Sequence, residues 1–157
     1  MFSNILKKTV SIMTKITGFL FFVVLLVTVA NILLRNVLSV SWLFMSGLLR
    51  LSFIWMVFTG TAVLYYNNDH LIMDFFSGKF SVKWHKIVDI LEQVMFLLFC
   101  AVLVFYGIQV TKVRMGIPFE TWKVPTGYAF VAVPVNGFIM ALFSIEKLIK
   151  MRSNSDD

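Results

Sequence analysis

Four long apolar runs, separated by short polar stretches, dominate the pattern of hydrophobic and polar positions along the chain. The runs cover about 18–38, 48–66, 87–110 and 127–149. As helices rising about 1.5 Å per residue, they would each be roughly 28–36 Å long, which matches the hydrocarbon thickness of a bilayer. A helix satisfies its backbone donors and acceptors internally, whereas an open strand in lipid would not. We therefore expect an all-α integral membrane protein with four transmembrane helices in one domain, residues 1–152, followed by a flexible tail, 153–157.

The stretches between the runs predict different kinds of connector. Residues 71–85 are too short and too polar to cross a bilayer but keep many apolar side chains, which is typical of an amphipathic segment on the membrane surface. Residues 39–47 form a shorter segment of this kind on the opposite side. Residues 116–127 hold two prolines and two glycines, which favour an ordered turn region.

Composition supports a membrane protein and excludes several other classes. Hydrophobic residues make up 59% of the 157 and charged residues 14%, against about 45–50% and 25% in a typical soluble domain. Lys7 and Lys8 precede the first run, as in a signal peptide, but the run is too long and has no small-residue cleavage site near its end, so we expect a retained span. Cys100, the single cysteine, excludes an internal disulfide. The net charge of +6 comes from basic residues scattered between the runs, which is not the pattern of a nucleic-acid-binding face.

The distribution of basic residues predicts the orientation of the spans. With the N-terminus inside, the inner segments carry nine of the 14 Lys and Arg residues and the outer segments carry five. Short cytoplasmic loops are enriched in Lys and Arg. Both termini are therefore expected in the cytoplasm.

Charged and aromatic residues at the ends of the runs are expected to anchor the spans. Arg50 lies in the first turn of the second run, where its stem can follow the helix while the guanidinium reaches the lipid headgroups. The other expected interfacial anchors are Arg35, Trp42, His70 and Trp84.

Few residues suggest catalysis or ligand binding. Asp89 and Glu92 share a face at the start of the third run, where the helix dipole favours negative charge, so we expect a structural role and not a proton relay. His70 and His85 both lie at interfacial depth and do not face each other inside the membrane, which argues against haem. No nucleophile–base pair is evident. We therefore expect no enzyme activity, no cofactor and no metal site.

Small and polar residues inside the runs predict close helix contacts. Residues 59–62, Thr-Gly-Thr-Ala, give the second run a surface around Gly60 that another helix can approach. In the fourth run Pro134 removes a backbone donor and frees the Phe130 carbonyl, and Asn136 follows, which predicts a kink with a polar side chain near mid-bilayer. Gly60, Pro134 and Asn136, with Arg50, are candidates for contact with a partner protein or lipid. Packing among the four spans explains the first three equally well.

Two blocks of residues resemble a known family. The first block contains Arg50, Trp55, Phe58, Gly60, Ala62, His70 and Asp74, and the second contains Pro125, Gly127, Tyr128, Pro134 and Gly137. In this order and spacing, the chain resembles the small membrane subunit of TRAP transporters, the DctQ-like family, over nearly its whole length. Members often carry a Glu a few residues before the Arg, whereas this chain has the segment 44–47, Phe-Met-Ser-Gly. Arg50 would then need another partner, either a lipid phosphate or an acid on a second protein.

The resemblance implies a role in a three-part sodium symporter of the bacterial inner (cytoplasmic) membrane. In such a complex, a periplasmic substrate-binding protein captures an organic acid, of the sialic acid or C4-dicarboxylate class. A large multi-span DctM-like permease subunit carries the acid inward by an elevator motion, and the small subunit packs on the static scaffold of the large one. If the binding protein docks partly on this chain, the expected surface contains Lys112, Arg114, Glu120 and Lys123.

A different class of function also has to be considered. A self-assembling small membrane channel or exporter would need polar residues that face a common axis. The available residues Asn31, Glu92 and Asn136 are few and lie at different depths. We therefore keep the channel as the alternative.

Overall fold

Four long helices form the chain in the computed structural model, which describes residues 2–37, 43–67, 82–120 and 122–153. The long helices are α1 (Phe2–Val37), α2 (Leu43–Asn67), α4 (Val82–Met115) and α6 (Ala132–Ser153). Between α4 and α6 lie the strands β1 (Pro118–Phe119) and β2 (Trp122–Pro125) and the short helix α5 (Gly127–Phe130). Four segments are long and apolar enough to cross a membrane: Ser3–Asn36, Phe44–Asn67, Ile90–Met115 and Gly127–Ile149. The expected four-span all-α architecture is confirmed.

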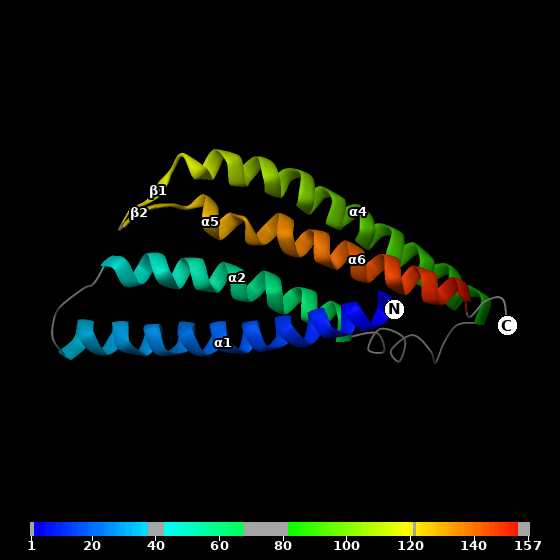
Figure 1. Ribbon diagram of the computed structural model, residues 1–157, viewed down its shortest axis with the longest axis horizontal. Coiled ribbons are helices and arrows are strands. Elements are labelled where there is room, and N and C mark those ends of the chain that lie inside the picture. Colours follow the sequence, from blue (N-terminus) through cyan, green and yellow to red (C-terminus); the bar gives the residue numbers. More distant parts are fainter. Residues whose placement is uncertain (1, 38–42, 68–81, 121, 154–157) are drawn as a thin grey trace.

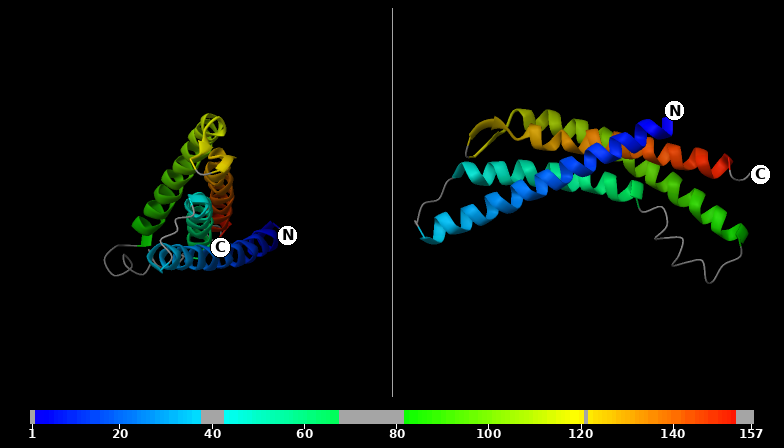
Figure 2. Two further views of the ribbon diagram at one scale, coloured as in Figure 1. Left: turned by 90° about the vertical axis from the view of Figure 1, so that its left-hand side faces the viewer. Right: turned by 60° about the horizontal axis from the view of Figure 1, so that its bottom comes forward.

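The helices lie side by side along their length (Figure 1). Helix α1 packs on α2, α2 also contacts α6, and α6 packs on α4. The N-terminal end of α1 and the C-terminal end of α6 lie at one end of the bundle, which we call the terminal end. The β1–β2 hairpin lies at the opposite end, which we call the hairpin end. Figure 2 shows that α1 crosses the other helices obliquely.

Helix α1 is longer than the first apolar run because lysines interrupt the run without interrupting the helix. Leu6, Val10 and Met13 lie at i, i+4 and i+7 and are almost completely buried. Lys7 and Lys8 point away from this face and are exposed. The N-terminal turns of α1 are therefore amphipathic, and their apolar face packs into the bundle.

The connectors agree only in part with the sequence-based prediction. Of the predicted surface segment 39–47, residues 43–47 belong to α2, in which Gly47 is buried, and 39–42 lie outside the described residues. Residues 82–85 form the start of α4, whereas 71–81 lie outside the described residues. Residues 116–120 and 122–127 form the expected ordered turn region, in which β1 pairs with β2 in antiparallel fashion. Of the predicted tail, Ser153 ends α6, and 154–157 lie outside the described residues.

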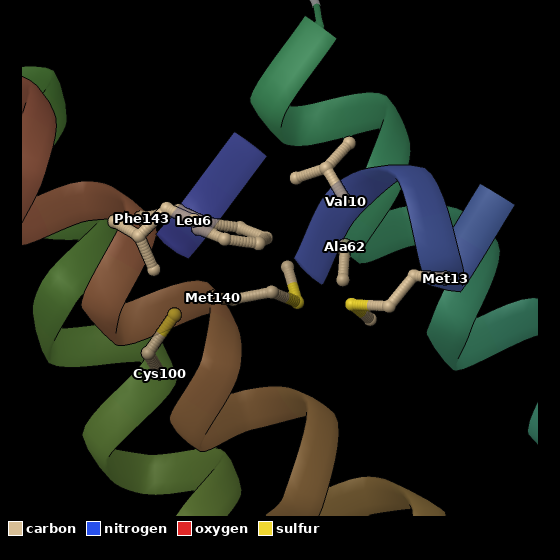
Figure 3. Packing of buried hydrophobic residues seen from close by; sticks show 7 residues of the cluster. All are labelled: Leu6, Val10, Met13, Ala62, Cys100, Met140 and Phe143. Carbon is tan, nitrogen blue, oxygen red and sulfur yellow. The ribbon is translucent and has the colours of Figure 1, made fainter. Parts of the chain in front are cut away.

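The buried apolar core lies where all four long helices meet. Figure 3 shows its members, which are Leu6, Val10 and Met13 of α1, Ala62 of α2, Cys100 of α4, and Met140 and Phe143 of α6. Much of the remaining apolar surface is exposed: Phe19 is 67% exposed and Val113 68%. None of the most apolar 18-residue window of α1 is buried. Apolar surface on this scale needs lipid or a partner protein to cover it.

Glycines allow α4 and α6 to approach closely. A Cβ on Gly107 would lie 3.0 Å from Cδ of Pro134, and a Cβ on Gly137 would lie 3.3 Å from Cβ of Leu103. The fourth span is interrupted as predicted, because the helix breaks at Val131 between α5 and α6, but the break lies near the start of the span Gly127–Ile149 and not at its middle. Proline at 134 has no N–H to donate to the carbonyl four residues earlier, which explains the position of the break.

Candidate functional site

A cavity of about 220 Å³ opens at the hairpin end between α2 and the α4–hairpin junction. Its lining residues are Ser46, Gly47, Arg50, Arg114, Ile117, Pro118, Phe119, Glu120 and Thr126. Two of these side chains are positive and one is negative, so the lining carries a net positive charge. Arg50 and Arg114 are 64 residues apart in the sequence, and the fold brings both to the lining of one cavity. This site combines basic side chains with an apolar surface.

Thr126 fixes the hairpin that forms one side of the cavity. Its backbone N–H donates to the Ile117 carbonyl at 2.8 Å. Its hydroxyl lies 2.9 Å from the same carbonyl and 3.1 Å from that of Arg114, so it can donate to either. The Thr126 side chain is buried. One residue therefore ties the return strand to the end of α4.

Close contact with α4 also constrains the residue after Thr126. A Cβ on Gly127 would lie 2.8 Å from the backbone nitrogen of Met115, a distance that real Cβ atoms do not show. Glycine is therefore required for this approach of α5 to α4.

Aromatic residues of α5 hold the neighbouring elements in place. The Arg114 guanidinium carbon lies 5.3 Å from the centroid of the Phe130 ring, a cation–π contact. Trp55 of α2 donates its indole N–H to the Tyr128 carbonyl at 3.1 Å. These contacts set the position of Arg114 relative to α2, and hence to Arg50.

A second polar cluster lies nearer the terminal end and joins three helices. The Tyr65 hydroxyl of α2 donates to Oε1 of Gln93 of α4 at 2.6 Å, and the Ser144 hydroxyl of α6 donates to the same oxygen at 3.2 Å. The Tyr65 ring stacks on Phe96 with centroids 3.8 Å apart. Lys147 Nζ lies 5.7 Å from the centroid of the Tyr65 ring. The sequence-based reasoning did not single out Gln93 or Ser144.

A sequence signal for Gln93 exists in its spacing. Gln93, Cys100 and Gly107 are seven residues apart and are all buried on the α6-facing side of α4. Polar or small residues that recur every seven positions are typical of a helix face that packs on another helix.

The structure places three of the four predicted partner or lipid contacts inside the chain. A Cβ on Gly60 would lie 3.3 Å from Cγ2 of Thr17, so Gly60 faces α1. Pro134 lies against Gly107 of α4. Asn136 is 2% exposed and donates to the Ala132 carbonyl of its own helix at 2.8 Å. These contacts favour packing among the spans for the three residues, whereas Arg50 is exposed at the cavity.

The predicted anchors are only partly described. Arg35 is exposed in the last turn of α1. Trp42 and His70 lie outside the described residues, and Trp84 lies in α4 with a side chain whose position is not described.

The four residues of the predicted docking surface lie at the hairpin end, two of them in the cavity lining and two outside it. Lys112 and Lys123 are exposed and lie outside the cavity lining, whereas Arg114 and Glu120 line it. Among the residues that the structure describes, no group of three or more His, Cys, Asp or Glu side chains could hold a metal ion.

The fold and its apolar surface define a multi-pass membrane protein with polar contacts at both ends. Comparison with protein families gives a match over residues 24–154 to the family described as tripartite ATP-independent periplasmic transporters, DctQ component. The match covers well over half of the chain, and the chain belongs to this family. It is thus a small component of a TRAP transporter. A comparison with curated proteins finds no match.

Proposed function

We propose that this chain is the accessory membrane subunit of a sodium-coupled TRAP importer of organic acids, and that it packs on the scaffold of a large DctM-like permease subunit. The observation that carries this proposal is the family match over residues 24–154. The substrate would be an acid of the sialic acid or C4-dicarboxylate class, delivered by a periplasmic binding protein. The chain itself would have no catalytic role.

The buried polar groups support a scaffold role. Gln93, Ser144 and Asn136 make hydrogen bonds within the chain and are almost completely buried. The Ser144–Gln93 hydrogen bond joins α6 to α4, and the Asn136–Ala132 hydrogen bond lies within α6. The exposed surface of α1 and α4 is largely apolar, which suits contact with lipid and with the spans of a larger subunit.

The arrangement of the helices supports the placement of both termini on one side of the membrane, and the distribution of Lys and Arg favours the cytoplasm of a bacterial cell as that side, with the hairpin end in the periplasm. The N-terminal end of α1 and the C-terminal end of α6 lie at the same end of the bundle, as an even number of spans requires. Lys112 and Lys123 are exposed at the hairpin end, where a periplasmic binding protein could reach them.

The first test is gentle extraction of the chain from its native membranes through a C-terminal tag, with identification of co-purifying proteins by mass spectrometry. A stoichiometric multi-span permease is the expected result. Recovery of the chain alone, or only with copies of itself, would contradict the accessory role and favour the self-assembling channel or exporter.

A further measurement tests the chemistry of transport. The purified complex in proteoliposomes, supplied with its binding protein, should accumulate an organic acid when a sodium gradient is applied. A potassium gradient of equal size is the control. Uptake that is equal under both gradients would exclude sodium coupling.

A further inference from the structure

We propose that the hairpin-end cavity binds the phosphate of a phospholipid headgroup between Arg50 and Arg114, with an acyl chain of the same lipid on the exposed face of α2. The proposal requires only that the chain spans a membrane and does not depend on a permease partner.

Both arginines lie towards the hairpin end of a segment that could cross a membrane, Arg50 in Phe44–Asn67 and Arg114 in Ile90–Met115. Arg114 lies in the last turn of α4, at the end of a span. Arg50 is the eighth residue of α2, about 10 Å along the helix from its first residue. Because helical side chains lean towards the N-terminus, the Arg50 side chain is directed towards the hairpin end and the headgroup layer.

The cavity wall has the chemistry of a phosphate site. A guanidinium presents a planar fork of N–H donors that matches phosphate oxygens, and two residues that carry this group line the cavity. Glu120 supplies the single negative charge among the lining residues, so the net charge of the wall is +1. A monoanionic phosphodiester would balance this charge.

The surface next to Arg50 selects a ligand with an apolar tail. Phe53, Val57 and Leu64 follow Arg50 at i+3, i+7 and i+14, so they continue the same helix face. Their exposed fractions are 54%, 41% and 59%. A charged site directly above an exposed apolar stripe fits a phospholipid better than it fits free phosphate or the carboxylate of a protein side chain.

The test is native mass spectrometry of the delipidated full-length chain, titrated with phosphatidylglycerol and, in parallel, with a diacylglycerol of the same acyl chains. Wild-type protein should bind the phospholipid at least about tenfold more tightly, since only the phospholipid offers an anion to the arginines. Equal binding of the two lipids would overturn the proposal. This comparison uses wild-type protein alone, so it does not depend on the folding of any variant.

Variants then locate the site. Arg50→Gln and Arg114→Gln should each weaken phosphatidylglycerol binding about tenfold, because each removes charged hydrogen bonds to the phosphate. Lys112→Gln, which removes a charge from the same end of α4 but outside the cavity lining, should change binding by less than about twofold. Equal effects of all three substitutions would show general surface attraction and overturn the proposed site.

A competition experiment separates the two sources of phosphate. Inorganic phosphate at millimolar concentration should leave the bound phosphatidylglycerol in place, because it offers nothing to the apolar stripe. Displacement of the lipid at that concentration would identify a free-anion site and overturn the lipid assignment.

Discussion

Tyr65 on α2 donates a 2.6 Å hydrogen bond to Oε1 of Gln93 on α4, and Ser144 on α6 donates to that same oxygen at 3.2 Å. The Gln93 side-chain oxygen on α4 therefore accepts one hydrogen bond from a residue of α2 and one from a residue of α6. Gln93 is 1% exposed and Ser144 is fully buried. Lipid offers no replacement for these bonds, so the cluster fixes the register of the three helices.

Replacement of Gln93 by leucine should destabilise the chain. The substitution leaves two hydroxyl groups, those of Tyr65 and Ser144, without their shared acceptor, at an expected cost of about 1–3 kcal/mol. Thermal unfolding of the purified protein in detergent would measure the loss. Gln109→Leu is the matched control, because Gln109 lies on the same helix and is exposed, and its expected effect is within about 0.5 kcal/mol. Equal stability of the two variants would show that the cluster does not hold the helices together.

Gly60 should tolerate a large side chain poorly, whereas Gly18 should tolerate one well. A Cβ on Gly60 would already lie 3.3 Å from Cγ2 of Thr17, so Gly60→Leu should force α1 and α2 apart, at a cost of about 1–3 kcal/mol. A Cβ on Gly18 would have no atom within 4 Å, and Gly18→Leu should be neutral or slightly stabilising. Thermal unfolding of the two variants measures the difference.

The same pair of variants tests the proposed assembly. If the α1–α2 pair supports contact with a large subunit, Gly60→Leu should lower both recovery of the permease and uptake, while Gly18→Leu lowers neither. Wild-type permease recovery and uptake by a folded Gly60→Leu protein with a lowered unfolding temperature would count against a role of the α1–α2 pair in assembly.

The length and apolar character of the runs were enough to predict the four spans. Backbone hydrogen bonding in lipid leaves helix as the only solution for such runs, so the number of spans follows from local sequence. The ends of the helices were less predictable. Lys7, Lys8 and Lys15 lower the hydropathy of the N-terminal turns, yet these turns are helical, because Leu6, Val10 and Met13 pack on the other helices.

The candidate sites depended on contacts that sequence alone does not show. The role of Arg50 at the membrane interface could be predicted from its place in the run, but its neighbour Arg114 could not, since only the fold brings the two to one cavity. The acceptor role of Gln93 was missed because its partners lie 28 and 51 residues away. The small residues around Gly60 left packing within the chain and contact with a partner equally open, and the structure places Gly60 against α1.

Charge reversal at Lys123 should weaken uptake if the binding protein docks at the hairpin end. Lys123 is exposed there and does not line the cavity, so Lys123→Glu should slow the encounter without disturbing the lipid site. We expect uptake to fall a few-fold at low ionic strength and the difference from wild type to shrink as salt screens the charges. Uptake assays over a range of salt concentrations would measure this effect. Lys8→Glu at the opposite end is the control, and an equal loss in both variants would remove the docking proposal.

The orientation of the bundle can be tested with single cysteines, because the native thiol is protected. Cys100 is fully buried, so wild-type protein should react little with a membrane-impermeant maleimide. Lys123→Cys places a thiol at the exposed hairpin end and Asn4→Cys places one at the exposed start of α1. With both termini in the cytoplasm, Lys123→Cys should be labelled in intact cells, and Asn4→Cys only after the inner membrane is permeabilised. The reverse pattern would show that the hairpin end faces the cytoplasm, and a periplasmic binding protein could then not reach Lys112 or Lys123.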